Sequence, residues 1–122
     1  MDNIHVLIVD DEEDLAATIA ERLEIRGIKT ETASDGDSAL VSLKTNPPDV
    51  VVLDLMMPGI GGLGILKQIN LLENKIPVIL LTGYGSKERS IEGMNLGAID
   101  YVLKPCNLDD LITKIQAAVR SK

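Results

Sequence analysis

The sequence predicts an α/β fold in which a parallel five-stranded sheet carries helices on both faces. Residues 50–53 form an unbroken apolar run with three β-branched valines, which is typical of a strand buried on both faces. Four further short strand patterns lie at residues 4–9, 28–33, 77–82 and 99–103. An amphipathic helical pattern follows each of the five, and this alternation is characteristic of parallel sheets joined by right-handed crossovers.

The first two strand-helix units have clear boundaries. The apolar run at residues 4–9 breaks at five consecutive acidic residues, 10–14, where a helix begins. Apolar residues of that helix then recur at every fourth position, at Leu15, Ile19 and Leu23. Gly27 is expected to end it. The second helix spans residues 36–45, between the turn at residues 34–36 and the Asn46-Pro47-Pro48 stop.

Three more helices are predicted from their apolar positions. These positions are Ile65, Leu66, Ile69 and Leu72 in the third helix, Ile91 and Met94 in the fourth, and Leu108, Leu111, Ile112, Ile115 and Val119 in the fifth. With no linker or repeat between the units, residues 1–122 are expected to form a single domain.

Composition excludes several functions. The net charge of −7 argues against binding to the phosphate backbone of nucleic acids or to anionic membranes. Two Tyr and no Phe or Trp leave little for base stacking. The single cysteine, Cys106, cannot form an internal disulfide, and no apolar stretch has the length of a membrane span. We therefore expect a cytoplasmic protein.

For five such units the common flavodoxin-like, doubly wound strand order is 2-1-3-4-5. This order brings polar residues from the ends of four strands to one rim of the sheet. They are Asp10, Asp11, Asp54, Thr82 and Lys104. In open α/β sheets, ligands bind at this rim, beside the switch point between strands 1 and 3.

The acidic loop after the first strand indicates which ligand the rim accepts. It lacks the Gly, Ser or Thr residues that present backbone N–H groups to a phosphate, so flavin or dinucleotide binding is not expected. Helix capping and the helix dipole account for some of these acids, but not for a doublet that faces Asp54. Carboxylates and phosphoryl oxygens are the ligands that Mg²⁺ prefers.

These residue types suit phosphoryl transfer. Asp54 is predicted to act as a nucleophile that becomes an aspartyl phosphate. A cation held by Asp11 and Asp54 would neutralise the transferring oxygens, with Lys104 acting from the other side. Thr82 would donate a hydrogen bond to a phosphoryl oxygen.

Four motifs in this order resemble the receiver domain of bacterial two-component response regulators. They are Val9-Asp10-Asp11-Glu12, the segment 54–59, Leu81-Thr82-Gly83 and Leu103-Lys104-Pro105. The resemblance covers nearly the whole chain. It implies that Asp54 accepts a phosphoryl group from a sensor histidine kinase or phosphotransfer protein. A changed surface on the fourth helix, fifth strand and fifth helix would then control an output domain or target protein.

The resemblance also implies particular roles. Mg²⁺ would be bound by Asp11, Asp54 and the carbonyl of Met56, with Asp10 assisting through water. Thr82 and Tyr101 would form the switch pair, and the Lys104-Pro105 peptide would be cis, which proline makes accessible.

Three interpretations remain open. The first is a phosphorylation switch that is not a turnover enzyme. The resemblance implies that it loses its phosphoryl group slowly, since in the family the positions of Met56 and Tyr84 flank the path of the attacking water. The second is a metal-dependent phosphohydrolase with an aspartyl nucleophile, but Met56 stands where such enzymes need a second acid. The third is an interaction module that is never phosphorylated, which the complete set of acids and Lys104 argues against.

Overall fold

The structure, a computed structural model, describes residues 3–55, 57, 61–72, 75–83, 87–104 and 107–120. In this part of the chain, strands and helices alternate as the sequence predicts. The strands are β1 (His5–Val9), β2 (Lys29–Ala33), β3 (Val50–Asp54), β4 (Val78–Thr82) and β5 (Asp100–Leu103). The helices are α1 (Glu13–Ile25), α2 (Gly36–Thr45), α3 (Gly61–Asn70), α4 (Lys87–Asn95) and α5 (Leu108–Arg120).

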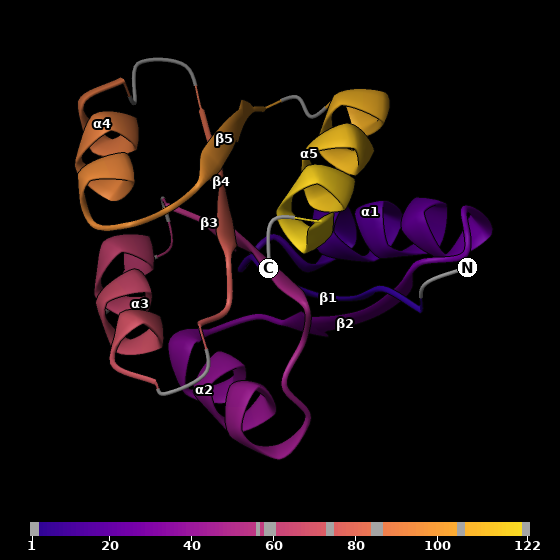
Figure 1. The fold of residues 1–122 in the computed structure, drawn as a ribbon, viewed down its shortest axis with the longest axis horizontal. Coiled ribbons are helices and arrows are strands. Elements are labelled where there is room, and N and C mark those ends of the chain that lie inside the picture. The colour runs from indigo at the N-terminus through magenta and orange to yellow at the C-terminus, as the bar shows by residue number, and fades with distance from the viewer. Residues whose placement is uncertain are drawn as a thin grey trace.

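The strands form one parallel sheet in the order β2-β1-β3-β4-β5, which confirms the predicted flavodoxin-like topology (Figure 1). Strand β3 lies at its centre, and every residue from Val50 to Asp54 is buried. Because β3 has neighbours on both edges and helices on both faces, water reaches it only past its ends. The carboxyl end of β3 is therefore where a buried strand can present a side chain to a ligand.

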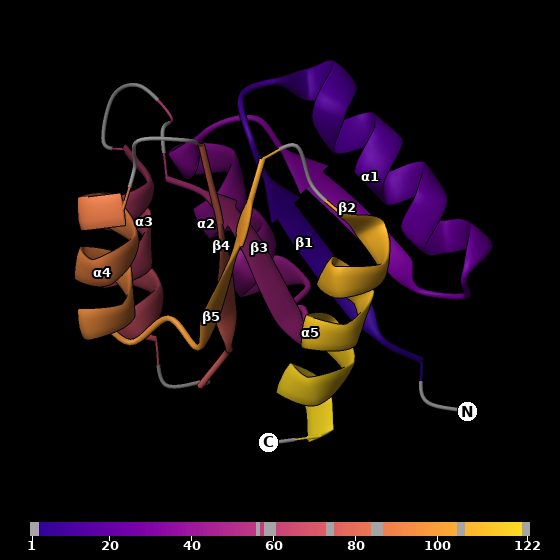
Figure 2. The ribbon, with the colours of Figure 1, turned by 90° about the horizontal axis from the view of Figure 1, so that it is seen from above.

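Helices cover the two faces of the sheet in unequal numbers. Helices α1 and α5 lie on one face, and α2, α3 and α4 lie on the other (Figures 1 and 2). Alternate residues of each strand point to opposite faces, so Val50 and Val52 join the core under α1 and α5. Val51 and Leu53 join the core under α2 and α3. This alternation explains why the strand is apolar at every position.

The predicted helix boundaries have recognisable caps. Gly27, at φ 84°, follows α1, and its N–H donates to the carbonyl of Glu24. Only glycine adopts this left-handed conformation without a steric penalty. At the start of α2, the Asp35 side chain accepts a hydrogen bond from the Ser38 N–H at 2.7 Å.

Helix α4 packs with a face that its sequence does not indicate. Ile91 and Met94, the apolar residues that mark this helix, are exposed, whereas Ser90 and Gly93 are buried. A Cβ added at Gly93 would lie 2.5 Å from the Leu80 Cδ1. The small residues allow α4 to approach β4, and this leaves its larger apolar residues on the outside.

Gly62 permits a close approach between α3 and the end of β3. A Cβ at this position would lie 2.5 Å from the carbonyl oxygen of Asp54 and 2.5 Å from the Leu55 Cα. Both atoms belong to the backbone, so neither can move aside cheaply. The glycine thus lets α3 pack directly behind the residue at the rim of the sheet.

Gly62→Ala is expected to lower the free energy of unfolding by about 1–3 kcal/mol, because the new methyl group overpacks a backbone contact. Gly83→Ala is the matched control: a Cβ there meets no atom within 4 Å and the backbone has no positive φ. Its effect should stay within about 0.5 kcal/mol. Urea unfolding of both variants measures the difference, and equal stabilities would contradict the close approach.

Candidate phosphoacceptor site

Strand pairing brings two carboxylates together at the rim. Val9 of β1 is paired with Leu53 of β3, so the next residue of each strand, Asp10 and Asp54, lie beside one another. Thr82 ends β4 and is paired with Leu103 of β5, and Lys104 follows immediately. The Lys104 N–H donates to the Thr82 carbonyl at 2.7 Å, which continues the ladder beyond the strand. The sheet order thus gathers the predicted rim residues Asp10, Asp54, Thr82 and Lys104.

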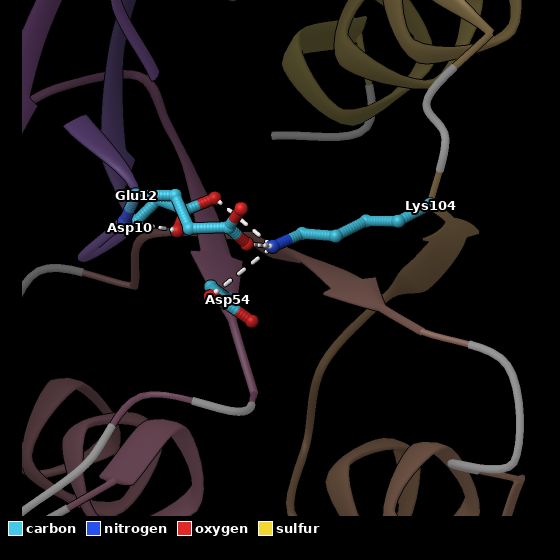
Figure 3. A network of polar contacts seen from close by, with 4 residues as sticks. All are labelled: Asp10, Glu12, Asp54 and Lys104. Atoms are coloured by element: carbon cyan, nitrogen blue, oxygen red, sulfur yellow. Dashed lines mark hydrogen bonds and ion pairs between the residues drawn. The ribbon is translucent and has the colours of Figure 1, made fainter. Parts of the chain in front are cut away.

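The Lys104 ammonium group lies among three carboxylates (Figure 3). Its Nζ is 2.9 Å from the Glu12 Oε1 and 3.3 Å from both the Asp10 Oδ2 and the Asp54 Oδ2. The side chain extends from the end of β5 to the ends of β1 and β3. One positive charge is therefore paired with three negative charges, and two of these three are on fully buried residues.

Burial and charge shift the pKa values of two of these groups. Burial raises the pKa of Asp10 to about 6, and the neighbouring Asp54 also raises it. The Glu12 N–H, which donates to the Asp10 Oδ1 at 2.9 Å, lowers it and limits the shift. Burial lowers the pKa of Lys104, but Glu12, Asp54 and Asp10 together hold it above its ordinary value. Lys104 is therefore a permanent cation.

The residues fit a hard divalent cation. Asp10, Glu12 and Asp54 each offer a carboxylate oxygen, and these oxygens all lie within 4.8 Å of one another. Mutual repulsion between these carboxylates is only partly offset by one ammonium group. Oxygen donors and uncompensated negative charge are what Mg²⁺ requires of a protein.

The predicted magnesium ligands are only partly brought together. Asp10 and Asp54 belong to the group of three carboxylates, but among the described residues its third member is Glu12 rather than Asp11. Asp11 is exposed. Met56, whose carbonyl is the remaining predicted ligand, lies outside the described residues, as do Tyr84 and the Pro105 of the predicted cis peptide.

Sequence reasoning placed Glu12 in the Val9-Asp10-Asp11-Glu12 motif but gave it no role in the site. No pattern in the sequence singled it out, because the chain bends at Asp11 and the Glu12 N–H donates to the Asp10 Oδ1. Glu12, at φ −81° and ψ 87°, precedes the first turn of α1. Its carboxylate lies beside that of Asp10, whereas Asp11 between them is exposed.

The two residues of the predicted switch pair differ in environment. Thr82 is fully buried, and its Oγ1 has no hydrogen-bond partner among the described residues. Tyr101 is 41% exposed. The Lys114 Nζ lies 5.8 Å from the centre of its ring and donates to its carbonyl at 2.8 Å.

Comparison with known proteins identifies this arrangement. Residues 6–116 match the family model of the response regulator receiver domain. The chain is 37% identical over 115 residues to regulatory protein AtoC of Escherichia coli, covering 94% of the chain and 25% of that protein. It is 41% identical over 115 residues to sensory transduction protein RegX3 of Mycolicibacterium smegmatis, covering 94% of the chain and 50% of that protein.

Solved structures of receiver domains have the same fold as this chain. The receiver domain of the Francisella response regulator 1452 superposes with a TM-score of 0.89 at 39% identity, covering 98% of this chain and 100% of that one. The receiver domain of NtrX from Brucella abortus gives a TM-score of 0.91 at 34% identity, covering 96% and 99%.

The chain belongs to the response regulator receiver domain family. It spans about half or less of the length of the two curated relatives named above. None of the helices in the described residues is long and apolar enough to cross a membrane.

In the absence of divalent cations, Asp10→Asn is expected to raise the free energy of unfolding by about 1–3 kcal/mol near pH 7.5. The reason is that it removes the cost of a buried ionised carboxylate. Below the ordinary pKa of 3.8 the carboxyl group is protonated in both the folded and unfolded states, so the gain vanishes. The gain grows as pH rises from 3.8 to about 6 and is complete above that.

Urea unfolding in chelator across this pH range measures the effect. Asp14→Asn makes the same charge change on an exposed residue of α1 and should show no such growth. An Asp10→Asn variant that is less stable than the wild type at neutral pH would contradict the raised pKa of Asp10.

Proposed function

We propose that this chain is a phosphorylation-activated signalling switch in which Asp54 accepts a phosphoryl group in a Mg²⁺-dependent reaction. One observation carries the proposal. A carboxylate at the end of the central buried strand lies 3.3 Å from a lysine ammonium group and within a cluster of acids suited to a divalent cation. Purely structural ion pairs rarely leave two buried carboxylates to share one cation.

The reaction follows from the positions of these groups. An Asp54 carboxylate oxygen attacks phosphorus, a new O–P bond forms, and the bond from phosphorus to the donor breaks. The leaving group takes the electron pair and a proton. Lys104 contributes positive charge beside the attacking oxygen, and the backbone contact at Gly62 holds the end of β3 in place.

Asp54, together with Asp10 and either Asp11 or Glu12, would hold Mg²⁺, and the family's remaining ligand is the carbonyl of Met56. The ion would supply positive charge for the transferring phosphoryl oxygens. The sheet contributes by pairing β1 with β3, so that Asp10, which follows β1, lies beside Asp54 at the end of β3.

The proposed switch uses Thr82 and Tyr101. The buried Thr82 Oγ1 lacks a hydrogen-bond partner among the described residues, so it has a donor available for a phosphoryl oxygen. Movement of Thr82 toward the phosphoryl group would open space into which the half-exposed Tyr101 ring rotates. That rotation would remake the surface of α4, β5 and α5.

The partners proposed are a sensor histidine kinase or phosphotransfer protein as the donor and an output domain or target protein as the receiver of the signal. Exposed apolar side chains on α4 and β5 support such a contact surface; they are Ile91, Met94, Tyr101 and Leu103. The chain would act in the cytoplasm without contacting nucleic acid or membrane. Slow loss of the phosphoryl group is proposed from Met56 and Tyr84.

Incubation with acetyl phosphate and Mg²⁺ should add the mass of one phosphoryl group, about 80 Da, to the wild type. Asp54→Asn should gain nothing, because the amide is not a nucleophile, and chelation of Mg²⁺ should abolish the adduct. Intact-mass spectrometry measures both. Rapid release of phosphate without an adduct would favour a phosphohydrolase, and no reaction at all would favour an interaction module.

Thr82→Val is expected to raise the stability of the unphosphorylated protein by about 1 kcal/mol, because it removes a buried unpaired hydroxyl group. The same change should uncouple the switch. Nuclear magnetic resonance with beryllofluoride should show a shift at Tyr101 in the wild type and little shift in the variant. Thr113→Val on the exposed part of α5 is the control, and an undiminished Tyr101 shift in Thr82→Val would exclude the coupling.

A further inference from the structure

Lys104 has as many donors as it has carboxylates around it. An ammonium group carries three N–H bonds, and the Asp10, Glu12 and Asp54 oxygens all lie within 3.3 Å of the Nζ (Figure 3). A phosphoryl group on Asp54 brings new oxygens that need the same donors. The ammonium group donates hydrogen bonds to Glu12 and Asp54, whereas its contact with the Asp10 Oδ2 is an ion pair without a hydrogen bond. The phosphoryl oxygens would compete with these carboxylates for the ammonium group, and the carboxylate that loses this competition releases it.

The three carboxylates differ in how easily they can do so. The side chains of Asp10 and Asp54 are 0% and 2% exposed, so neither can exchange the ammonium group for solvent. The side chain of Glu12 is 62% exposed, and water can replace the lysine there at little cost. Glu12 nevertheless makes the shortest contact, at 2.9 Å.

We infer that Glu12 is a positioning residue that holds Lys104 in the unphosphorylated protein and releases it to the phosphoryl group. Glu12 lies at the junction between β1 and α1, outside the sheet, so its side chain can swing into solvent while Asp10 and Asp54 stay in place. Since Lys104 must leave Glu12 before it can serve the phosphoryl oxygens, the contact slows phosphorylation. This inference rests on the proposed function of Asp54.

A spectroscopic test examines the contact and its release. The ¹⁵Nζ resonance of Lys104 is assigned by its absence in Lys104→Arg and recorded without divalent cations. It should shift in Glu12→Gln and stay in place in Glu13→Gln. Glu13 provides the matched control because it is the exposed neighbour, loses the same charge, and has no contact with Lys104 among the described residues.

Addition of Mg²⁺ and beryllofluoride should bring the Lys104 resonances of the wild type and Glu12→Gln together, because Glu12 no longer holds the ammonium group. A difference that persists unchanged would overturn the release. A beryllofluoride-dependent shift in none of the proteins would instead reject the proposed function. The two failures are therefore distinguishable.

The rate of phosphorylation gives a second readout. With acetyl phosphate at saturating Mg²⁺, Glu12→Gln should be phosphorylated about two- to five-fold faster than the wild type, as expected for loss of a partly exposed ion pair. Glu13→Gln should stay within about 1.5-fold of the wild type. A Glu12→Gln rate equal to that of Glu13→Gln would overturn the inference. A rate well below that of Glu13→Gln would also overturn it and would favour Glu12 as a ligand of the cation.

Discussion

The rim of the sheet holds three carboxylates around one ammonium group, and this excess of negative charge is the constraint on which the site depends. Asp10 and Asp54 are buried because they continue the paired strands β1 and β3, so they cannot separate without breaking the sheet. Lys104 arrives from the end of β5 and offsets part of the repulsion. What remains unbalanced favours a divalent cation and, in the proposed function, the phosphoryl group that the cation assists.

The fold makes this concentration of charge tolerable. Strand β3 is buried along its whole length between two apolar cores, which anchor the backbone that carries Asp54. The contact between Gly62 and the backbone at residues 54 and 55 braces the same point from the α3 side. A site with unfavourable electrostatics thus lies at the end of a strand that is buried along its whole length, and packed secondary structure of this kind holds site residues in place.

The unphosphorylated protein contains groups whose interactions are incomplete or easily exchanged. The Thr82 Oγ1 is buried without a hydrogen-bond partner among the described residues, Tyr101 is half-exposed, and the Glu12 contact with Lys104 is open to water. A phosphoryl group on Asp54 would accept a hydrogen bond from the Thr82 Oγ1 and would compete with Glu12 for Lys104. Under the proposed function, the energy for the conformational change comes from these local exchanges, not from any large rearrangement of the core.

The sequence alone determined the α/β alternation, the strand order and the convergence of Asp10, Asp54, Thr82 and Lys104, because buried strands have distinctive patterns and parallel topology follows few rules. It did not determine which face α4 buries. The small residue Gly93 packs against Leu80, and the apolar residues Ile91 and Met94 are exposed. Contacts of α4 with α3 and β4 determine this orientation, and the spacing of apolar residues in the sequence does not. Nor did the sequence indicate that the Glu12 carboxylate lies beside those of Asp10 and Asp54 while Asp11, the predicted magnesium ligand, is exposed. Only the tertiary structure decided the direction of these carboxylates, because it depends on the backbone angles between β1 and α1 and on where the Lys104 side chain lies.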